Sequence, residues 1–124
     1  MFLIFSHQLS KEQTIEAEVR FGIDKYIYLP ENLQKIWSNI PPELQNISSY
    51  LEPIEKWLKT NVNVNDYVLI HGEFGSTYMM VNTTKTFGAY PIYSTTSRES
   101  VDTITKDGIQ KQSIFKHCIY RFYL

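Results

Sequence analysis

The chain has 124 residues, enough for one folded domain that buries about two thirds of its unfolded surface without disulfides or metals. Its 12 basic and 13 acidic side chains leave a formal net charge of −1. That balance argues against long duplex nucleic acid as a partner, because such binding needs a basic surface. Hydrophobic residues make up 43% of the chain, but no apolar run approaches the ~20 residues that span a bilayer, so we expect no membrane partner.

The N-terminus and the single cysteine indicate the compartment. Residues 1–7 are apolar but lack a basic leader and a small-residue cleavage site, so we expect a first strand rather than a signal peptide. Cys118 has no second cysteine for a disulfide and no partner ligands at metal spacing. We therefore expect a cytoplasmic protein without a metal site, in which Cys118 is a small core residue.

Strands and helices alternate in the first half of the sequence. We expect a first strand at residues 1–6, followed by a helix that begins with a capping box of Ser10 and Gln13 and ends at Gly22. A second strand is expected at 25–30. The helix after it begins at Pro30 and is interrupted at Pro41 and Pro42. A second helical stripe follows, with Leu44, Ile47, Leu51, Ile54 and Leu58 at helical spacing and a kink or new start expected at Pro53. We expect this stripe, with Trp37 and Trp57, to pack in the core.

The second half predicts two further strands, at residues 68–70 and 90–96, on either side of a short helix that runs from Gly75 to about Thr84. The tail differs, because Asp107-Gly108 is a strong hairpin signal between residues 101–106 and 109–123. These elements predict a single α/β domain over residues 1–124. Its fold is Rossmann-like, with a mainly parallel sheet flanked by helices and an antiparallel hairpin at the C-terminus.

The segment 65–77 suggests an anion site. A buried strand breaks there on Gly72 and Gly75, and Ser76 and Thr77 follow at the start of a helix. Free backbone N–H groups and the positive end of a helix dipole favour a phosphate or a carboxylate at such a place. The alternative is that the glycines only allow a tight strand-to-helix corner.

Polar residues gather where the parallel strands are expected to end. Ser6-His7 follows the first strand, residues 71–77 follow the third, and residues 95–98 follow the fourth. In open α/β sheets, ligands bind outside these carboxyl ends. On the last strand, a period of two places His117 and Arg121 on one face.

Several short motifs in one order support a family resemblance. They are Phe-Ser-His at 5–7 followed by Gln13, Gly-Glu-Phe-Gly at 72–75, Thr-Thr-Ser-Arg at 95–98, Phe-Lys-His at 115–117 and Arg-Phe-Tyr at 121–123. Together they resemble a family of small accessory proteins of type III CRISPR systems, similar to ring nucleases that degrade cyclic tetra-adenylate. The resemblance implies a fold related to the ligand-sensing CARF domains of CRISPR effectors, a homodimer, and cleavage that switches off immune signalling.

This resemblance and the positions above give the candidate site. The catalytic candidates are Arg98, His7 and His117, and the ligand-binding candidates are Ser6, Gly72, Phe74, Gly75, Ser76, Thr77, Thr95, Thr96 and Arg121. The adjacent 2′-hydroxyl of an RNA-type phosphodiester can act as the nucleophile, so no metal or cofactor is expected. The expected products are linear fragments that end in a 2′,3′-cyclic phosphate.

Other interpretations remain open. The protein is alternatively a sponge that binds cyclic oligoadenylate without turnover, or an interaction module that docks through its C-terminal strands. For single residues, Arg98 is alternatively a surface arginine paired with Glu99 or Asp102, and His7 a histidine that is merely hydrogen-bonded.

Overall fold

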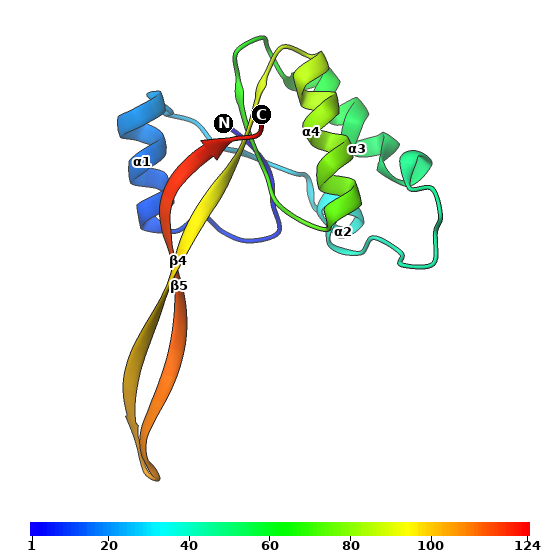
Figure 1. The fold of residues 1–124 in the computed structure, drawn as a ribbon. Coiled ribbons are helices and arrows are strands. Elements are labelled where there is room, and N and C mark those ends of the chain that lie inside the picture. Colours follow the sequence, from blue (N-terminus) through cyan, green and yellow to red (C-terminus); the bar gives the residue numbers. More distant parts are fainter.

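The computed structural model describes all residues 1–124 and contains one five-stranded sheet with helices on both faces (Figure 1). In chain order, the elements are β1 (Phe2–Ile4), α1 (Lys11–Phe21), β2 (Ile27–Tyr28), α2 (Glu31–Ser38), α3 (Ser48–Asn61), β3 (Tyr67–Ile70), α4 (Phe74–Thr86), β4 (Tyr90–Thr105) and β5 (Gly108–Phe122). The strand order across the sheet is β2-β1-β3-β4-β5. The first four strands pair in parallel and β5 pairs antiparallel with β4, which confirms the predicted α/β class.

The start and end of α1 follow from local hydrogen bonds. The Ser10 side chain accepts from the Gln13 N–H at 3.2 Å, and the Gln13 side chain accepts from the Ser10 N–H at 2.8 Å. Gly22 ends the helix in the left-handed conformation, with φ of 67°. The predicted capping box and helix end are therefore confirmed. Pro53 lies within α3, one helix from Ser48 to Asn61, so no new helix starts at Pro53.

Two cores lie on opposite faces of the sheet because strand side chains alternate. Helix α1 covers one face, where Leu3, Ala17 and Tyr120 are buried together. Helices α2, α3 and α4 lie on the other face, where Ile4 and Trp37 belong to a larger apolar cluster (Figure 1). The predicted stripe supplies Leu51, Ile54 and Leu58 to that cluster, whereas Leu44 is exposed in the loop before α3.

Strands β4 and β5 continue past the sheet as a twisted two-stranded ribbon, which we call the arm and define as residues 97–116 (Figure 1). The last β4 residue paired with β3 is Ile92, so all of the arm lies beyond the carboxyl ends of the parallel strands. The two strands predicted at 90–96 and 101–106 are one strand of 16 residues. The hairpin is confirmed, although Gly108 belongs to β5, where it pairs with Thr105 and has φ of 118°.

A bulge in β5 corrects two expectations. Between the pairs Ser94–Tyr120 and Thr96–His117, β5 contains one residue more than β4, so the alternation of its side chains shifts. His117 therefore lies on the α1 face, whereas Arg121 lies on the other face, and the prediction that they share a surface is wrong. Cys118, within the bulge, is exposed, so its prediction as a core residue is also wrong.

None of the helices has the length and apolar character that a membrane crossing requires.

Candidate functional site

The site lies at the carboxyl ends of β1 and β3, where the chain order of the sheet reverses. From β1 the chain passes through α1 on one face, and from β3 it passes through α4 on the other face. Such a reversal opens a crevice in α/β sheets, and ligands bind there. The loops after the two strands are in contact, because the His71 N–H donates to the Ile4 carbonyl and the ring of Phe5 packs edge-on against His7 and His71.

An open pocket of about 420 Å³ adjoins the β1 end of this crevice. Its lining includes the predicted residues Ser6 and His7. Residues of α2 complete it, and sequence reasoning missed them: Gln34, Lys35 and Ser38. The Gln34 side chain donates to the Phe5 carbonyl at 2.8 Å, and the hydroxyls of Ser6 and Ser38 are 3.2 Å apart. The loop after β1 is thus fixed to α2, which brings a lysine close to the proposed anion edge.

The first turn of α4 is capped by its own acidic residue. The Glu73 carboxylate accepts from the N–H groups of Gly75 and Ser76, and the Ser76 hydroxyl donates to the Glu73 carbonyl at 3.1 Å. The predicted phosphate donors therefore already have a carboxylate partner. The hydroxyl of Thr77 is buried without a hydrogen-bond partner, which is uncommon for a buried polar atom.

Gly72 and Phe74 differ in what surrounds them. A Cβ atom at Gly72 would lie 2.7 Å from the indole of Trp37, whose Nε1 donates to the His71 carbonyl at 3.0 Å. Packing of Trp37 is thus a sufficient reason for glycine at this position. The ring of Phe74 is 94% exposed, beside a second exposed aromatic residue one turn later, Tyr78.

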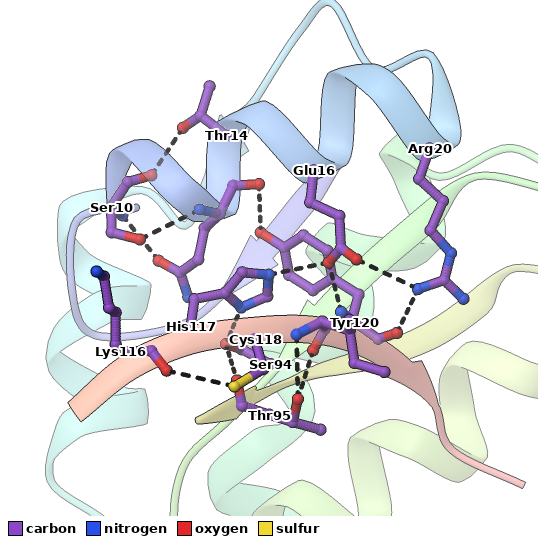
Figure 2. Close-up of polar contacts among 12 residues, drawn as sticks. Ser10, Thr14, Glu16, Arg20, Ser94, Thr95, Lys116, His117, Cys118 and Tyr120 are labelled. Atoms are coloured by element: carbon purple, nitrogen blue, oxygen red, sulfur yellow. Dashed lines mark hydrogen bonds and ion pairs between the residues drawn. The ribbon is translucent and has the colours of Figure 1, made fainter. Parts of the chain in front are cut away.

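His117 is held within a polar network on the α1 face of the sheet (Figure 2). Its Nδ1 lies 2.6 Å from the Ser94 hydroxyl and its Nε2 lies 2.9 Å from the Glu16 carboxylate. Glu16 also accepts from the Tyr120 N–H and lies 3.5 Å from Arg20. Since the Glu16 carboxylate accepts hydrogen bonds, Nε2 of His117 carries a proton and donates to it. The imidazole is only 3% exposed and uses both nitrogens.

The neighbouring Tyr120 is enclosed by the same network. Its hydroxyl donates to the Gln13 carbonyl at 3.0 Å. Burial raises the pKa of this phenol above its ordinary value, and the nearby Tyr26 and Glu16 raise it further. The network therefore ties α1 to β5 through hydrogen bonds to enclosed side chains. Sequence reasoning missed Glu16, although its position between Gln13 and Ala17, two buried residues of α1, indicates a helix face turned toward the sheet.

The predicted residues of the C-terminal strands lie apart from one another. The Thr95 hydroxyl bridges the bulge, where it accepts from the Ile119 N–H and donates to the Ile119 carbonyl. Thr96 pairs with His117, and Arg98 lies on the arm, where its Nε donates to the Ser113 hydroxyl at 2.9 Å. Arg121 donates to the Tyr93 hydroxyl at 3.0 Å. Neither Glu99 nor Asp102 forms an ion pair with Arg98.

The loops that carry Ser6, His7 and the segment 71–77 are thus in contact, although Ser6 and His7 line the pocket beside α2, whereas Glu73 and Gly75 line a separate one beside residues 40–47. Arg98 lies six residues beyond Ile92, roughly 20 Å farther along the strand. The described chain contains no group of three or more His, Cys, Asp or Glu side chains that could hold a metal ion.

Fold and site together define an α/β protein with a Rossmann-like sheet, a polar crevice at the reversal of strand order and a C-terminal hairpin arm. The chain belongs to the family described as the Uncharacterized protein MJ1673 family, whose model matches residues 1–121. A relative from Methanocaldococcus jannaschii, described as "Uncharacterized protein MJ1673", is 49% identical over 127 residues, which cover 99% of this chain and 95% of the relative. No solved structure matches the chain.

Proposed function

We propose that the protein binds cyclic tetra-adenylate at the carboxyl edge of its parallel sheet and cleaves it, as a ring nuclease that switches off type III CRISPR signalling. The observation that carries the proposal is the convergence of Ser6, His7 and the segment 71–77 at the reversal of strand order. This is the place where α/β sheets bind nucleotides. Two of the motifs that resemble the CRISPR accessory family, at residues 5–7 and 72–75, lie in these same loops.

The groups around the crevice suit an adenylate ligand. Ser6 and Lys35 supply a hydroxyl and a cation for phosphate, although Lys35 is also 3.9 Å from Glu31. The exposed ring of Phe74 is available to stack on an adenine, because nucleobases stack on exposed aromatic side chains. For the N–H groups of Gly75 and Ser76 to bind phosphate, the Glu73 carboxylate must turn outward, since it now occupies them.

The reaction needs no nucleophile from the protein. The ligand 2′-oxygen attacks the adjacent phosphorus, its proton passes to a base, and the bond from phosphorus to the 5′-oxygen breaks. The 5′-oxygen takes up a proton, and the linear product ends in a 2′,3′-cyclic phosphate. The protein has to hold the 2′-oxygen in line and stabilise the charge that develops on the phosphate oxygens.

His7 is better placed than His117 to move these protons. The His7 imidazole is exposed and has no hydrogen-bond partner, whereas both nitrogens of His117 are engaged and its ring is enclosed. A general acid or base must reach the reacting group directly or through one water. We therefore assign proton transfer to His7 and a positioning role to His117, which holds the base of the arm against α1.

A homodimer is part of the proposal. Cyclic tetra-adenylate carries four phosphates in a symmetric ring, so two identical half-sites related by a two-fold axis match it. Such signalling acts inside the cell, in agreement with the cytoplasmic location that the sequence predicts.

The test is incubation of the protein with excess labelled cyclic tetra-adenylate in the presence of a chelator. We expect multiple turnovers to products with a 2′,3′-cyclic phosphate. His7→Ala should lower the rate by about 10²–10⁴-fold, while Lys59→Ala, at the far end of α3, should leave it unchanged. Tight binding without products would instead identify a sponge, and absence of binding would favour an interaction module. Activity that is lost in chelator and restored by one metal would contradict the proposed chemistry.

A further inference from the structure

The arm exposes large apolar side chains that nothing in the protomer covers. Ile104 is 87% exposed, and Ile109 and Phe115 are each 69% exposed. All three lie on the part of β4 and β5 that extends beyond the sheet (Figure 1). A two-stranded ribbon is marginally stable in water by itself, so an arm of this length gains from packing against another surface.

These three side chains lie on one face of the arm, whereas the less exposed Val101 and Ile114 lie on the other. In register, Ile104 is opposite Ile109, and Arg98 is opposite Phe115. Because strand side chains alternate, the residues two apart on β4 share a face, together with their register partners on β5. We call this face the Ile104 face, and its members are Arg98, Ser100, Asp102 and Ile104 from β4 and Ile109, Lys111, Ser113 and Phe115 from β5.

The Ile104 face is complementary to itself. Asp102 and Lys111 are opposite each other in register, yet they form no ion pair within the protomer. Arg98 and Phe115 occupy one register pair, and a guanidinium over an aromatic ring is a favourable contact. A second copy of the same face therefore offers Asp102 to Lys111, the ring of Phe115 to Arg98, and isoleucines to isoleucines. Self-complementary patches of this kind form two-fold interfaces.

We infer that the Ile104 face of the arm is the surface through which two copies of this chain associate into a dimer. The inference deepens the proposed function, which rests on a dimer with a shared ligand site. It is nevertheless tested on the protein without ligand, so that its failure is distinct from a failure to bind or cleave cyclic tetra-adenylate. Association through the arms also holds the carboxyl edges of two protomers in one assembly.

The experiment compares variants on the two faces of the arm by sedimentation equilibrium and light scattering. The test variant combines Ile104→Asp with Ile109→Asp, and the matched control combines Thr103→Asp with Gln110→Asp. The control residues are the neighbouring register pair, so they lie on the opposite face. We expect a dimer for the wild-type protein and for the control. The test variant should weaken dimerisation by at least ~30-fold, the effect of losing one interfacial hot spot.

A second pair of variants tests the charges. Asp102→Lys leaves only basic charges on the Ile104 face and should weaken the dimer, whereas adding Lys111→Asp should restore it. Circular dichroism checks that each variant folds. A monomeric wild-type protein overturns the inference, as does a dimer that resists the test variant. If the wild-type protein is a monomer that binds a fluorescent poly(A) oligonucleotide, and the test variant does not bind this oligonucleotide, the face would be assigned to single-stranded RNA instead.

Discussion

Gly72 and Trp37 are in direct contact, since a Cβ atom at position 72 would lie 2.7 Å from the indole ring. The indole is buried and donates to the carbonyl of the residue before Gly72, so the ring has little freedom to move away. The loop after β3 and the end of α2 are thereby fixed relative to each other.

Gly72→Ala should therefore lower the free energy of unfolding by about 1–3 kcal/mol, the usual effect of inserting a methyl group into a packed contact. Gly75→Ala is the matched control. A Cβ atom at position 75 would have as its nearest neighbour a flexible Glu73 carboxylate oxygen at 3.1 Å, and alanine favours a helix more than glycine does. Urea denaturation of the two variants compares them. Equal stabilities would mean that Trp37 adjusts freely and that glycine is present at position 72 for another reason.

Glu16 should be more important for stability than any other acidic residue of α1. Glu16→Ala removes the acceptor of the His117 Nε2 proton and of the Tyr120 N–H, and leaves two enclosed donors without a partner. Each such donor costs about 1–3 kcal/mol, so we expect a loss of at least ~2 kcal/mol. Glu12→Ala, at an exposed position of the same helix, should change stability by less than about 0.5 kcal/mol. The measurement is denaturant unfolding followed by circular dichroism, and similar losses in both variants would contradict the role given to the network.

The elements that local rules define could be predicted from the sequence. The capping box of Ser10 and Gln13, the helix end at Gly22 and the hairpin near Gly108 depend on a few neighbouring residues, and each was found as predicted or within one residue. The bulge beside Thr95 could not be predicted, because it depends on pairing between residues more than twenty positions apart. That single extra residue separates His117 from Arg121.

The candidate site was predictable only in part, for the same reason. Ser6, His7 and residues 71–77 come together because parallel strands end at a common edge and because β1 and β3 are neighbours in the sheet. Lys35 and Gln34 join them only through the packing of α2, which no sequence motif indicates. The partner of His117 is 101 residues away in the chain.

Stability should fall as the pH rises above about 10. Burial raises the pKa of Tyr120 and of Tyr123 in the folded protein, whereas both phenols in the unfolded chain ionise near their ordinary value of 10.0. Above that pH the unfolded chain loses protons that the folded protein keeps, so the stability present at lower pH is progressively lost. Urea unfolding between pH 8 and about 11 measures this slope. Tyr120→Phe should make it shallower, and Tyr78→Phe, an exposed control, should leave it unchanged.

Phe74 should contribute to ligand binding but little to folding. Its ring is almost fully exposed, so Phe74→Ala removes few contacts within the protein. If an adenine stacks on the ring, its loss should weaken binding of cyclic tetra-adenylate about tenfold, because such stacking is worth about 1–3 kcal/mol per base. Calorimetry measures the affinity of this variant for cyclic tetra-adenylate and that of Val19→Ala, an exposed apolar control on α1. Unchanged affinity in Phe74→Ala would place the base elsewhere.

Arg98→Ala should lower the rate of cleavage more than it weakens binding of the intact ring. The Arg98 guanidinium uses its Nε in a bond to Ser113, which leaves its terminal N–H groups free. Arg98 is remote from the crevice of its own protomer, so it reaches the phosphate only if the dimer brings it to the crevice of the partner. Added negative charge develops on the phosphate oxygens as the 2′-oxygen attacks, so a guanidinium placed there contributes most in the transition state. Loss of one such donor typically costs about 10²–10³ in rate, whereas a solvated contact to the ground-state phosphate is worth much less.

Single-turnover cleavage and equilibrium binding have to be measured on the same Arg98→Ala protein, with its dimerisation checked, since Arg98 also belongs to the Ile104 face. Lys106→Ala, a cation in the turn of the arm, is the control for a general loss of positive charge. Equal losses of rate and affinity would mean that Arg98 binds ground state and transition state alike. If neither quantity changes, Arg98 lies outside the site, and Lys35, the one lysine or arginine that lines the pocket, becomes the candidate cation for the phosphate.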